Sequence, residues 1–313
     1  MDKRYLEIQD LLQQRAELSA KLNLIPYDGS IEIKKIDERK YIYIRKKVLG
    51  KYTSTYIDVF SDELFASISN MLKSAKDYKK KIRIINKKLA ELDYSEEELT
   101  PRVLLNIDFA MANMKSNIYD QAILEGIATT YPDTETIIEN GIVSGMKASD
   151  IQKILNLKHA WEFIMDKDVV ASKTSYFLLC HIAGLINDGF YTYGGRIRSV
   201  MVKIGGTTYV PPMPIEADVK KSIEEILNRN DSIIDIAIDL CLYCMKTQIF
   251  NDGNKRASVI FANHLLISKG EGLIVIPENN VSEFKKLLVN YYEGKDIITI
   301  KEFMKKKCWK KLK

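Results

Sequence analysis

The sequence predicts a mainly α-helical protein with two small antiparallel β elements. Apolar residues recur at helical spacing along most of the 313 residues. Three short alternating segments, rich in Ile, Tyr, Val and Thr, lie within residues 31–59 and predict a β-meander. Two apolar arms flank Gly205-Gly206 and predict a β-hairpin near 200–210. Because 46% of the residues are apolar, the chain can bury the core of one large or two modest globular domains.

A first domain is expected over residues 1–92, as a helical hairpin with the small sheet at one end. Its expected elements are a helix at 3–23, strands at 31–36, 40–47 and 52–59, and a helix at 62–92. Turns are expected near Asp37-Glu38 and Leu49-Gly50.

Positive charge is concentrated in this first domain. Residues 1–92 hold 20 Lys and Arg against 13 Asp and Glu, a net charge of +7, whereas the whole chain has +5. The rest of the chain is therefore slightly acidic. A basic helical hairpin can contact nucleic acid or an acidic partner, but a Lys-rich helix more commonly presents a solvated face. Both interpretations stay open, and no activity is specified by these residues.

A second domain is expected over residues 93–313. Thr100 should cap a helix that has Pro101 at its first position and ends near Lys115. A separate helix is expected at 116–127. Further along the chain, a helix is expected at 215–228, an apolar stretch at 232–245 and an apolar helix at 257–270.

The polar loop Gln248–Arg256 lies between two apolar segments and opens a helix. Free N–H groups and the helix dipole favour a phosphate at such a helix start. Gly253 lets the backbone approach a ligand closely. Asn254 can cap the helix and donate an amide hydrogen bond outward. The layout predicts an anion site.

Three charged side chains of this loop suit the same ligand. Lys255 and Arg256 add positive charge, and the planar guanidinium of Arg256 matches phosphate oxygens. Asp252 supplies the hard oxygen ligand that a phosphate-bound Mg²⁺ requires. The alternative without function is a polar turn that caps a helix.

The loop resembles the signature of the Fic (Fido) family, His-x-Phe-x-Asp/Glu-Gly-Asn-Gly/Lys-Arg-x-x-Arg. Its sequence is most similar to that of the Doc branch. Two positions depart from the signature: Gln248 stands at the catalytic His, and Val259 stands where many members have a second Arg. The matching residues are Phe250, Asp252, Gly253, Asn254, Lys255 and Arg256. For the second domain, the resemblance implies a helical bundle that carries a β-hairpin flap.

The resemblance also implies chemistry: transfer of AMP from ATP to a Ser, Thr or Tyr hydroxyl of a protein target, with Mg²⁺ as cofactor. It implies that Asp252 holds Mg²⁺ and that Phe250 anchors the loop. In the Doc branch the nucleotide is reversed and a phosphate is transferred, so a Doc-like kinase toxin is an alternative. Phosphate contacts are implied for Gly253, Asn254, Lys255 and Arg256, with Arg256 also in a catalytic role.

Gln248 cannot act as the family's His does, because a carboxamide takes up no proton near neutral pH. Loss of a general base typically costs a factor of ~10²–10⁴ in rate. Three interpretations stay open. The protein binds a nucleotide without transferring it, another group such as His181 or a substrate phosphate is the base, or Gln248 replaces an original His. Little or no AMP transfer is therefore expected.

Two further segments resemble family elements. Glu125-Gly126, in the expected helix at 116–127, match an inhibitory motif whose Glu blocks productive ATP binding, although Gln121 replaces its Ser or Thr. Because Val259 cannot accept this Glu, Glu125 either pairs with Arg256 or merely ends a helix.

Residues 194–198, Gly-Gly-Arg-Ile-Arg, resemble the segment that leads into the family's flap, which holds the target's extended segment by strand addition. The implied flap residues are Ile204, Gly205, Gly206, Thr207, Thr208 and Tyr209. A plain surface hairpin is the alternative.

Other protein classes are not favoured. No run of about 18 apolar residues predicts a membrane span, and the charged N-terminal segment predicts no secretory signal. Cys241 and Cys244 are interpreted as buried core thiols, because a zinc site would need a second pair nearby. His159, His181 and His264 are interpreted as satisfied core or groove histidines. A reducing, cytoplasmic location is expected.

Two classes of function stay open. The first is a nucleotide-dependent transferase, or its degenerate relative, acting on a protein target. The second is a non-catalytic scaffold whose basic first domain docks nucleic acid or a partner. The oligomeric state is undecided, a homo-oligomer included.

Overall fold

The computed structural model describes residues 3–48, 51–92, 94, 99–141, 143 and 145–312. The chain divides into two compact units, Met1–Glu96 and Glu97–Lys313. The prediction of a mainly α-helical fold with a small three-stranded antiparallel sheet is confirmed. Among the described residues, no helix combines the length and the apolar character needed to cross a membrane.

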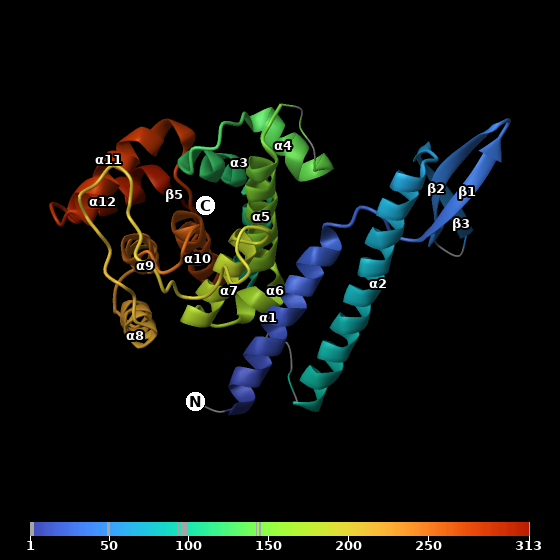
Figure 1. Cartoon of the computed structure of the whole chain (residues 1–313). Helices are drawn as coiled ribbons and strands as arrows, with labels where there is room; N and C mark the ends of the chain where they lie inside the picture. The colour runs from blue at the N-terminus through green and yellow to red at the C-terminus, as the bar shows by residue number, and fades with distance from the viewer. Residues whose placement is uncertain are drawn as a thin grey trace. The chain divides into compact units, whose positions relative to one another are not determined.

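The N-terminal unit is a pair of helices with a meander at one end (Figure 1). Its elements are α1 (Lys3–Asn23), β1 (Ser30–Ile36), β2 (Arg39–Val48), β3 (Lys51–Val59) and α2 (Asp62–Glu91). The three strands pair in chain order, and both pairings are antiparallel. The expected turn at Asp37-Glu38 is present, while the turn at Leu49-Gly50 and the boundary at Asp93 lie outside the described residues.

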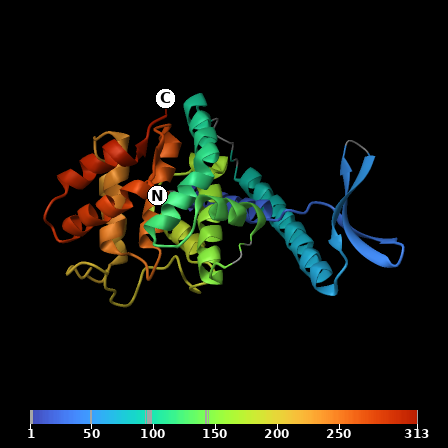
Figure 2. The same cartoon turned by 90° about the horizontal axis from the view of Figure 1, so that it is seen from above.

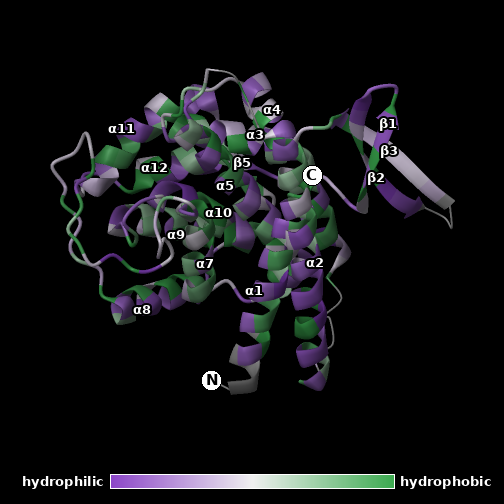
Figure 3. Cartoon of the chain, turned by 45° about the vertical axis from the view of Figure 1, so that its right-hand side comes forward, coloured by the Kyte–Doolittle hydropathy of each residue, from purple (hydrophilic) through white to green (hydrophobic). Residues whose placement is uncertain are grey.

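Two small apolar clusters hold this unit together. One joins α1 to α2 through Leu11, Leu12, Ile85 and Leu89. The other packs one face of the sheet, with Ile42 and Ile44, against the first half of α2, a placement also visible from above (Figure 2). Both helices carry hydrophobic and hydrophilic residues side by side in Figure 3, as amphipathic helices do.

The C-terminal unit is a bundle built around α10 (Asn254–Lys269), which is buried along nearly all of its length. Helices α3, α5, α7 and α9 pack directly on it (Figure 1). The other helices are α3 (Pro101–Leu124), α4 (Tyr131–Asn140), α5 (Ala148–Met165), α6 (Lys167–Ala171), α7 (Tyr176–Ile186), α8 (Glu216–Leu227), α9 (Ile233–Thr247), α11 (Val281–Tyr292) and α12 (Ile298–Phe303). Short strands β4 (Leu273–Ile274) and β5 (Trp309–Lys310) pair antiparallel.

Two helices were expected between Pro101 and residue 127, and the structure has one. Thr100 caps α3 and Pro101 is its first residue, as predicted. The helix continues through Ser116, whose hydroxyl donates to the carbonyl of Asn113 at 3.0 Å inside the same helix. A serine that bonds back to its own helix interrupts nothing, so the predicted break was wrong.

The expected β-hairpin at 200–210 is also wrong in part. The turn is present, with Gly206 at φ 80°. None of residues 200–210 lies in a strand. Pro211 and Pro212 have no N–H to extend a ladder, and their carbonyls accept hydrogen bonds from the buried guanidinium of Arg198 instead. A side chain, rather than a strand ladder, therefore holds the base of this segment.

Candidate functional site

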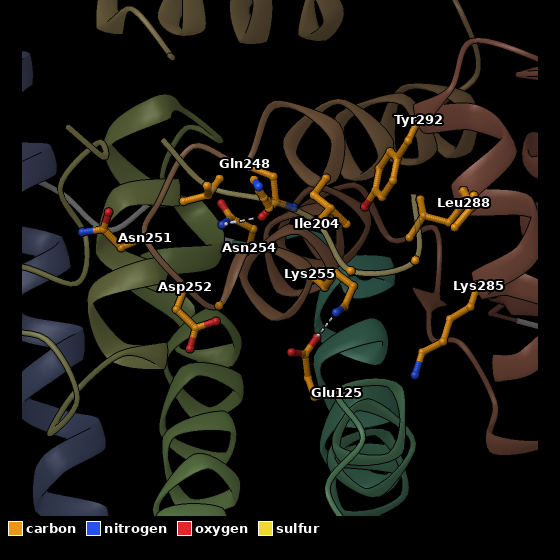
Figure 4. A pocket seen from close by; sticks show the side chains of 16 residues that line it. Glu125, Ile204, Gln248, Asn251, Asp252, Asn254, Lys255, Lys285, Leu288 and Tyr292 are labelled. Atoms are coloured by element: carbon orange, nitrogen blue, oxygen red, sulfur yellow. Dashed lines mark hydrogen bonds and ion pairs between the residues drawn. The ribbon is translucent and has the colours of Figure 1, made fainter. Parts of the chain in front are cut away.

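A cavity of about 570 Å³ lies at the start of α10 (Figure 4). Its walls are residues 202–206, the loop between α9 and α10, one face of α11, and Glu125 at the end of α3. The predicted site residues that line it are Glu125, Ile204, Gly205, Gly206, Gln248, Asp252, Gly253, Asn254 and Lys255. The other predicted residues, Gly126, Thr207, Thr208, Tyr209, Phe250 and Arg256, are not part of its lining.

Gln248 lines this cavity, but its side-chain amide is hydrogen-bonded to the last turn of α9 and to Asn254. It ends α9 in the left-handed conformation, with φ 48°. Its Nε2 donates to the carbonyl of Met245 at 2.6 Å, and its Oε1 accepts from Asn254 Nδ2 at 3.2 Å. The side chain is therefore a fixed hydrogen-bonding group at the position of the family's base.

Asn254 does not cap α10, contrary to the expectation. Gly253 is the N-cap residue, and Asn254 begins the helix. Its Oδ1 accepts from the N–H of Phe250 at 2.9 Å and its Nδ2 donates to the Phe250 carbonyl at 2.8 Å, so it closes the loop from inside. No side chain in the described part of the chain caps α10, which leaves the helix start to a ligand or solvent.

Gly253 is required by the protein's own packing. It has φ 73°, and a Cβ there would lie 2.6 Å from Ile186 Cγ2 and 3.1 Å from Asn187 Oδ1. Asn187 Nδ2 in turn donates to the carbonyls of Asp252 and Gly194, at 3.0 and 3.1 Å. Asn187 was missed by sequence reasoning, although it follows directly on the apolar run 176–186.

Arg256 lies behind the cavity wall and is only 2% exposed. Its Nη2 is 3.2 Å from Asp252 Oδ2, and its Nε is 3.6 Å from Glu125 Oε2. Within the described residues, Arg256 Nε and Nη1 and Glu125 Oε1 have no hydrogen-bond partner. Buried polar groups are rarely left in this state without a bound ligand, ion or water.

Glu125 occupies the space between the two cations of the loop. Besides Arg256 it lies 3.5 Å from Lys255 Nζ, the contact drawn in Figure 4. Gly126, at φ 78°, follows the last turn of α3. Gln121 fixes this end of the helix, because its Nε2 donates to the Arg256 carbonyl at 2.9 Å and its Oε1 accepts from Trp161 at 3.0 Å.

Arg198 ties residues 200–212, which we call the flap segment, to the loop Gln248–Arg256. Its Nε donates to the carbonyl of Gln248 at 2.6 Å, its Nη1 donates to the carbonyl of Val200 at 2.8 Å, and its backbone N–H donates to the carbonyl of Ile249 at 2.9 Å. Burial lowers the pKa of Arg198 from its usual value. Sequence reasoning placed Arg198 in the segment before the flap but gave it no role.

The second arm of the flap segment is held by Glu293, just beyond α11. Glu293 Oε1 accepts from Thr207 Oγ1 at 3.0 Å and from the Thr208 N–H at 3.3 Å. Lys295 pairs with the other carboxylate oxygen at 2.6 Å. The hydrogen bond from Lys295, followed by those from the two threonines, lowers the pKa of Glu293 to about 2.

Seven cavity residues were missed by sequence reasoning: Val202, Lys203, Asn251, Lys285, Leu288, Val289 and Tyr292. Lys285 and Tyr292 share one face of α11 with Leu288, at spacings of three and four residues. That spacing was visible in the sequence, but nothing in it indicated that this face meets the loop. Tyr292 also stacks on Tyr209 of the flap segment, with ring centroids 6.1 Å apart.

The described residues include few side chains that could bind a metal ion at the cavity. No cluster of three or more His, Cys, Asp or Glu side chains suited to a metal occurs among the described residues. Asp252, with its side chain 49% exposed, is the carboxylate of the loop itself. Mg²⁺ commonly needs only one or two carboxylates when a substrate phosphate supplies further oxygens, so Asp252 fits that mode.

The histidines and cysteines lie elsewhere. His264 is fully buried between Thr174 Oγ1 at 2.9 Å and the Val169 carbonyl at 2.8 Å, and burial lowers its pKa to about 4. His181 lies against the Phe163 ring, and it does not line the described cavity, so it has no geometric support as the base. The two thiols at 241 and 244 are buried, as predicted.

Comparisons with known proteins find similarity to Fic proteins. The model of the Fic/DOC family matches residues 174–266. The chain is similar to the protein adenylyltransferase Fic of Drosophila persimilis, at 27% identity over 188 residues, and to that of Drosophila grimshawi, at 25% over 221 residues. These matches cover 57% and 66% of this chain but only 36% and 45% of the relatives, so the chain spans less than half their length.

Solved structures show the same fold at low identity. Fic-1 from C. elegans matches with a TM-score of 0.52 and 18% identity, over 76% of this chain and 72% of that chain. A Fic family protein from Desulfovibrio desulfuricans G20 matches with a TM-score of 0.50 and 17% identity, over 67% and 73% of the two chains.

Proposed function

Because the chain contains a Fic-type domain, we propose that its cavity binds a nucleotide together with Mg²⁺. The transfer that we favour for it moves AMP from ATP to a Ser, Thr or Tyr hydroxyl of a protein target. The native residue at position 248 makes this transfer slow, so nucleotide binding is the principal activity of the site.

The observation that carries the proposal is the cationic wall around the start of α10. Lys203, Lys255 and Lys285 reach the cavity from the flap segment, the loop and α11. They lie near the N-terminus of α10, where no side chain among the described residues caps the first N–H groups. Lysines and a helix N-terminus together favour a ligand with several negative charges. A volume of about 570 Å³ suits a nucleotide triphosphate.

Two side chains of the loop complete the proposed phosphate-binding site. Asp252 would hold Mg²⁺, which when bound neutralises phosphate charge. Arg256 Nε and Nη1 are buried and have no hydrogen-bond partner among the described residues, and a rearrangement that brings them to phosphate oxygens would satisfy them. In the present arrangement Glu125 lies beside both loop cations and competes with a phosphate for them.

The target hydroxyl would approach along residues 202–206, which line the cavity opposite the loop. Gln248 can orient this hydroxyl through hydrogen bonds but cannot take its proton. Positioning and electrostatic stabilisation remain available without the base. A rate lower by ~10²–10⁴ than with a positioned base follows.

A second candidate, transfer of the terminal phosphate, is favoured by one observation. Val259 is buried in α10, where a second Arg is found in many members of the family. Without that Arg the orientation of the triphosphate is less constrained. ATP labelled at the α-phosphate or at the γ-phosphate separates the two reactions, since only AMP transfer leaves the α-label on protein.

Isothermal calorimetry with a pair of matched lysine variants tests the proposed binding site. Lys285→Ala removes a charge from the cavity, whereas Lys286→Ala removes the same charge from an exposed neighbour outside it. ATP with Mg²⁺ should bind the native protein, bind Lys285→Ala several-fold more weakly, and bind Lys286→Ala as it binds the native protein. Equal weakening in both variants would show a general charge effect, and no binding to the native protein would refute the proposal.

A further inference from the structure

The sheet of the N-terminal unit has one packed face and one open face. Ile42 and Ile44 of β2 point toward α2 and are buried. Because side chains alternate along a strand, the residues between them and beyond them point the other way. The register of the three strands brings neighbours from β1 and β3 to that same side. We call the open side the tyrosine face: Lys34, Tyr43, Arg45, Lys47, Tyr52 and Tyr56.

Aromatic rings on this face are exposed to an unusual degree. Tyr52 is 63% exposed and Tyr56 is 51% exposed. The ring of Tyr43 meets that of Tyr56 edge-on, with centroids 5.6 Å apart. Large apolar groups that gather on a surface generally mark a binding site.

Cations are interleaved with these rings. The Arg45 guanidinium lies 4.2 Å from the centroid of the Tyr52 ring, and Lys34 Nζ lies 4.4 Å from that of Tyr43. Lys47 Nζ also approaches Tyr52, at 5.9 Å. Over residues 30–59 the chain has eight Lys and Arg against four Asp and Glu, so the whole sheet is cationic.

Charge and ring geometry together select one kind of partner. Positive charge alone would suit any anionic surface, including an acidic peptide or a lipid bilayer. Exposed rings beside cations suit a polymer that offers both phosphates and flat aromatic groups, which is a nucleic acid with unpaired bases. In a duplex the faces of the bases are hidden in the stack, so a single strand fits and a duplex does not.

Glu32 favours RNA over DNA. It lies opposite Tyr43 in the register, on the same side of the sheet, and its Oε2 accepts from Ser54 Oγ at 2.6 Å. This carboxylate also pairs with Lys34 Nζ at 3.6 Å, and it can accept a hydrogen bond from a ribose 2′-hydroxyl, which DNA lacks.

We propose that the tyrosine face binds single-stranded RNA, with bases stacked on Tyr52 and Tyr56 and phosphates paired with Arg45 and Lys47. This binding is separate from the nucleotide cavity and does not depend on the function proposed for it.

Fluorescence anisotropy with the full chain and a labelled single-stranded RNA about a dozen nucleotides long tests the stacking. The double variant Tyr52→Ala with Tyr56→Ala should bind at least ~10-fold more weakly, because each stacked base contributes substantially to affinity. The double variant Tyr52→Phe with Tyr56→Phe keeps both rings and should bind within about threefold of the native chain. Circular dichroism checks that all four substitutions leave the fold intact. Native affinity in the alanine variant would overturn the proposal.

A matched pair of charge variants tests the phosphate contacts. Arg45→Ala with Lys47→Ala should weaken binding and make it less dependent on salt. Lys80→Ala with Lys88→Ala removes the same charge from exposed positions on α2 and should change neither. Equal effects of the two pairs would mean that only the overall charge matters, which contradicts a defined face.

Competitors identify the partner. An unlabelled duplex, a single-stranded DNA of the same sequence, a poly-glutamate peptide and phosphatidylserine vesicles should each compete more weakly than the single-stranded RNA. Equal competition by the DNA would overturn the assignment to RNA. Equal competition by the peptide or the vesicles would overturn the assignment to nucleic acid, as would the absence of any RNA binding.

Discussion

Replacing Gln248 by His should give the cavity the base that it lacks. The substitution places an imidazole two residues before Phe250 and four before Asp252, in the register of the family's signature. Residue 248 has φ 48°, and His is among the residues that accept this left-handed conformation more readily than most. The backbone should therefore accept the change.

The structure gives the scale of both the cost and the gain. The native amide makes two side-chain hydrogen bonds, to Met245 at 2.6 Å and with Asn254 at 3.2 Å. At about 0.5–1.5 kcal/mol for each, their complete loss would cost about 1–3 kcal/mol of folding free energy. A positioned base contributes ~10²–10⁴ in rate. Because Val259 leaves one phosphate contact missing, we expect the rate of transfer to rise by at least ~10-fold rather than by the full ~10²–10⁴.

The assay is self-modification with ATP labelled at the α-phosphate, followed on native protein and Gln248→His side by side. Calorimetry on both proteins establishes that ATP with Mg²⁺ still binds. If the variant binds the nucleotide but transfers no more label than the native protein, the missing base is not the limiting defect. If the native protein itself transfers label rapidly, the role assigned to Gln248 is wrong.

Three further predictions concern the surroundings of the cavity. Gly253→Ala should cost about 2–5 kcal/mol in urea unfolding, since a left-handed alanine costs ~1–2 kcal/mol and overpacking ~1–3; a loss below about 1 kcal/mol would contradict the packing at 2.6 Å. Glu125→Gln should raise ATP affinity by roughly 5–30-fold in calorimetry, because it removes a negative charge 3.5 Å from Lys255; unchanged affinity would show that Glu125 does not compete with the ligand. The pKa of Glu293 is lowered from 4.5 to about 2, so its stabilising contacts are complete above pH 4.5 and are lost as the pH falls toward 2. The protection factor of the Thr208 amide against hydrogen exchange should fall over that interval, and a pH-independent protection factor would refute this role of Glu293.

Much of the fold around the cavity could be predicted from the sequence. The helices before and after the loop are long apolar segments that end in recognisable signals, such as Gly270 after α10 at φ 70°. Thr100-Pro101 likewise marked the start of α3, because Thr caps a helix and Pro is favoured at its first position. These signals are local, and local signals are what a single sequence carries.

The errors arose where a distant partner decided the outcome. Residues 200–210 have the composition of a hairpin, but Arg198 and Glu293 hold the two arms and replace the strand ladder. Asn254 looks like a helix cap, yet its amide turns back to the main chain of Phe250. Neither contact could be recognised from spacing alone.

The candidate site shows the same difference between local signals and contacts with distant residues. The loop residues were identified because they are contiguous, whereas Lys203 and Lys285 come from segments far from the loop in sequence and near it in space. The sequence identified Gly253 as a cavity residue but could not show that its missing Cβ also makes room for Ile186.

The most direct test of the central claim is a thermal shift with ATP, with and without Mg²⁺, on the native protein and on Asp252→Ala. At a ligand concentration of about 100 times Kd, binding adds about 2.7 kcal/mol of stability, or roughly 5–11 °C in Tm for a unit of this size. The shift of the native protein should depend on Mg²⁺, and that of Asp252→Ala should not. If ATP with Mg²⁺ leaves the native Tm unchanged at millimolar concentration, the cavity at the start of α10 is not a nucleotide site.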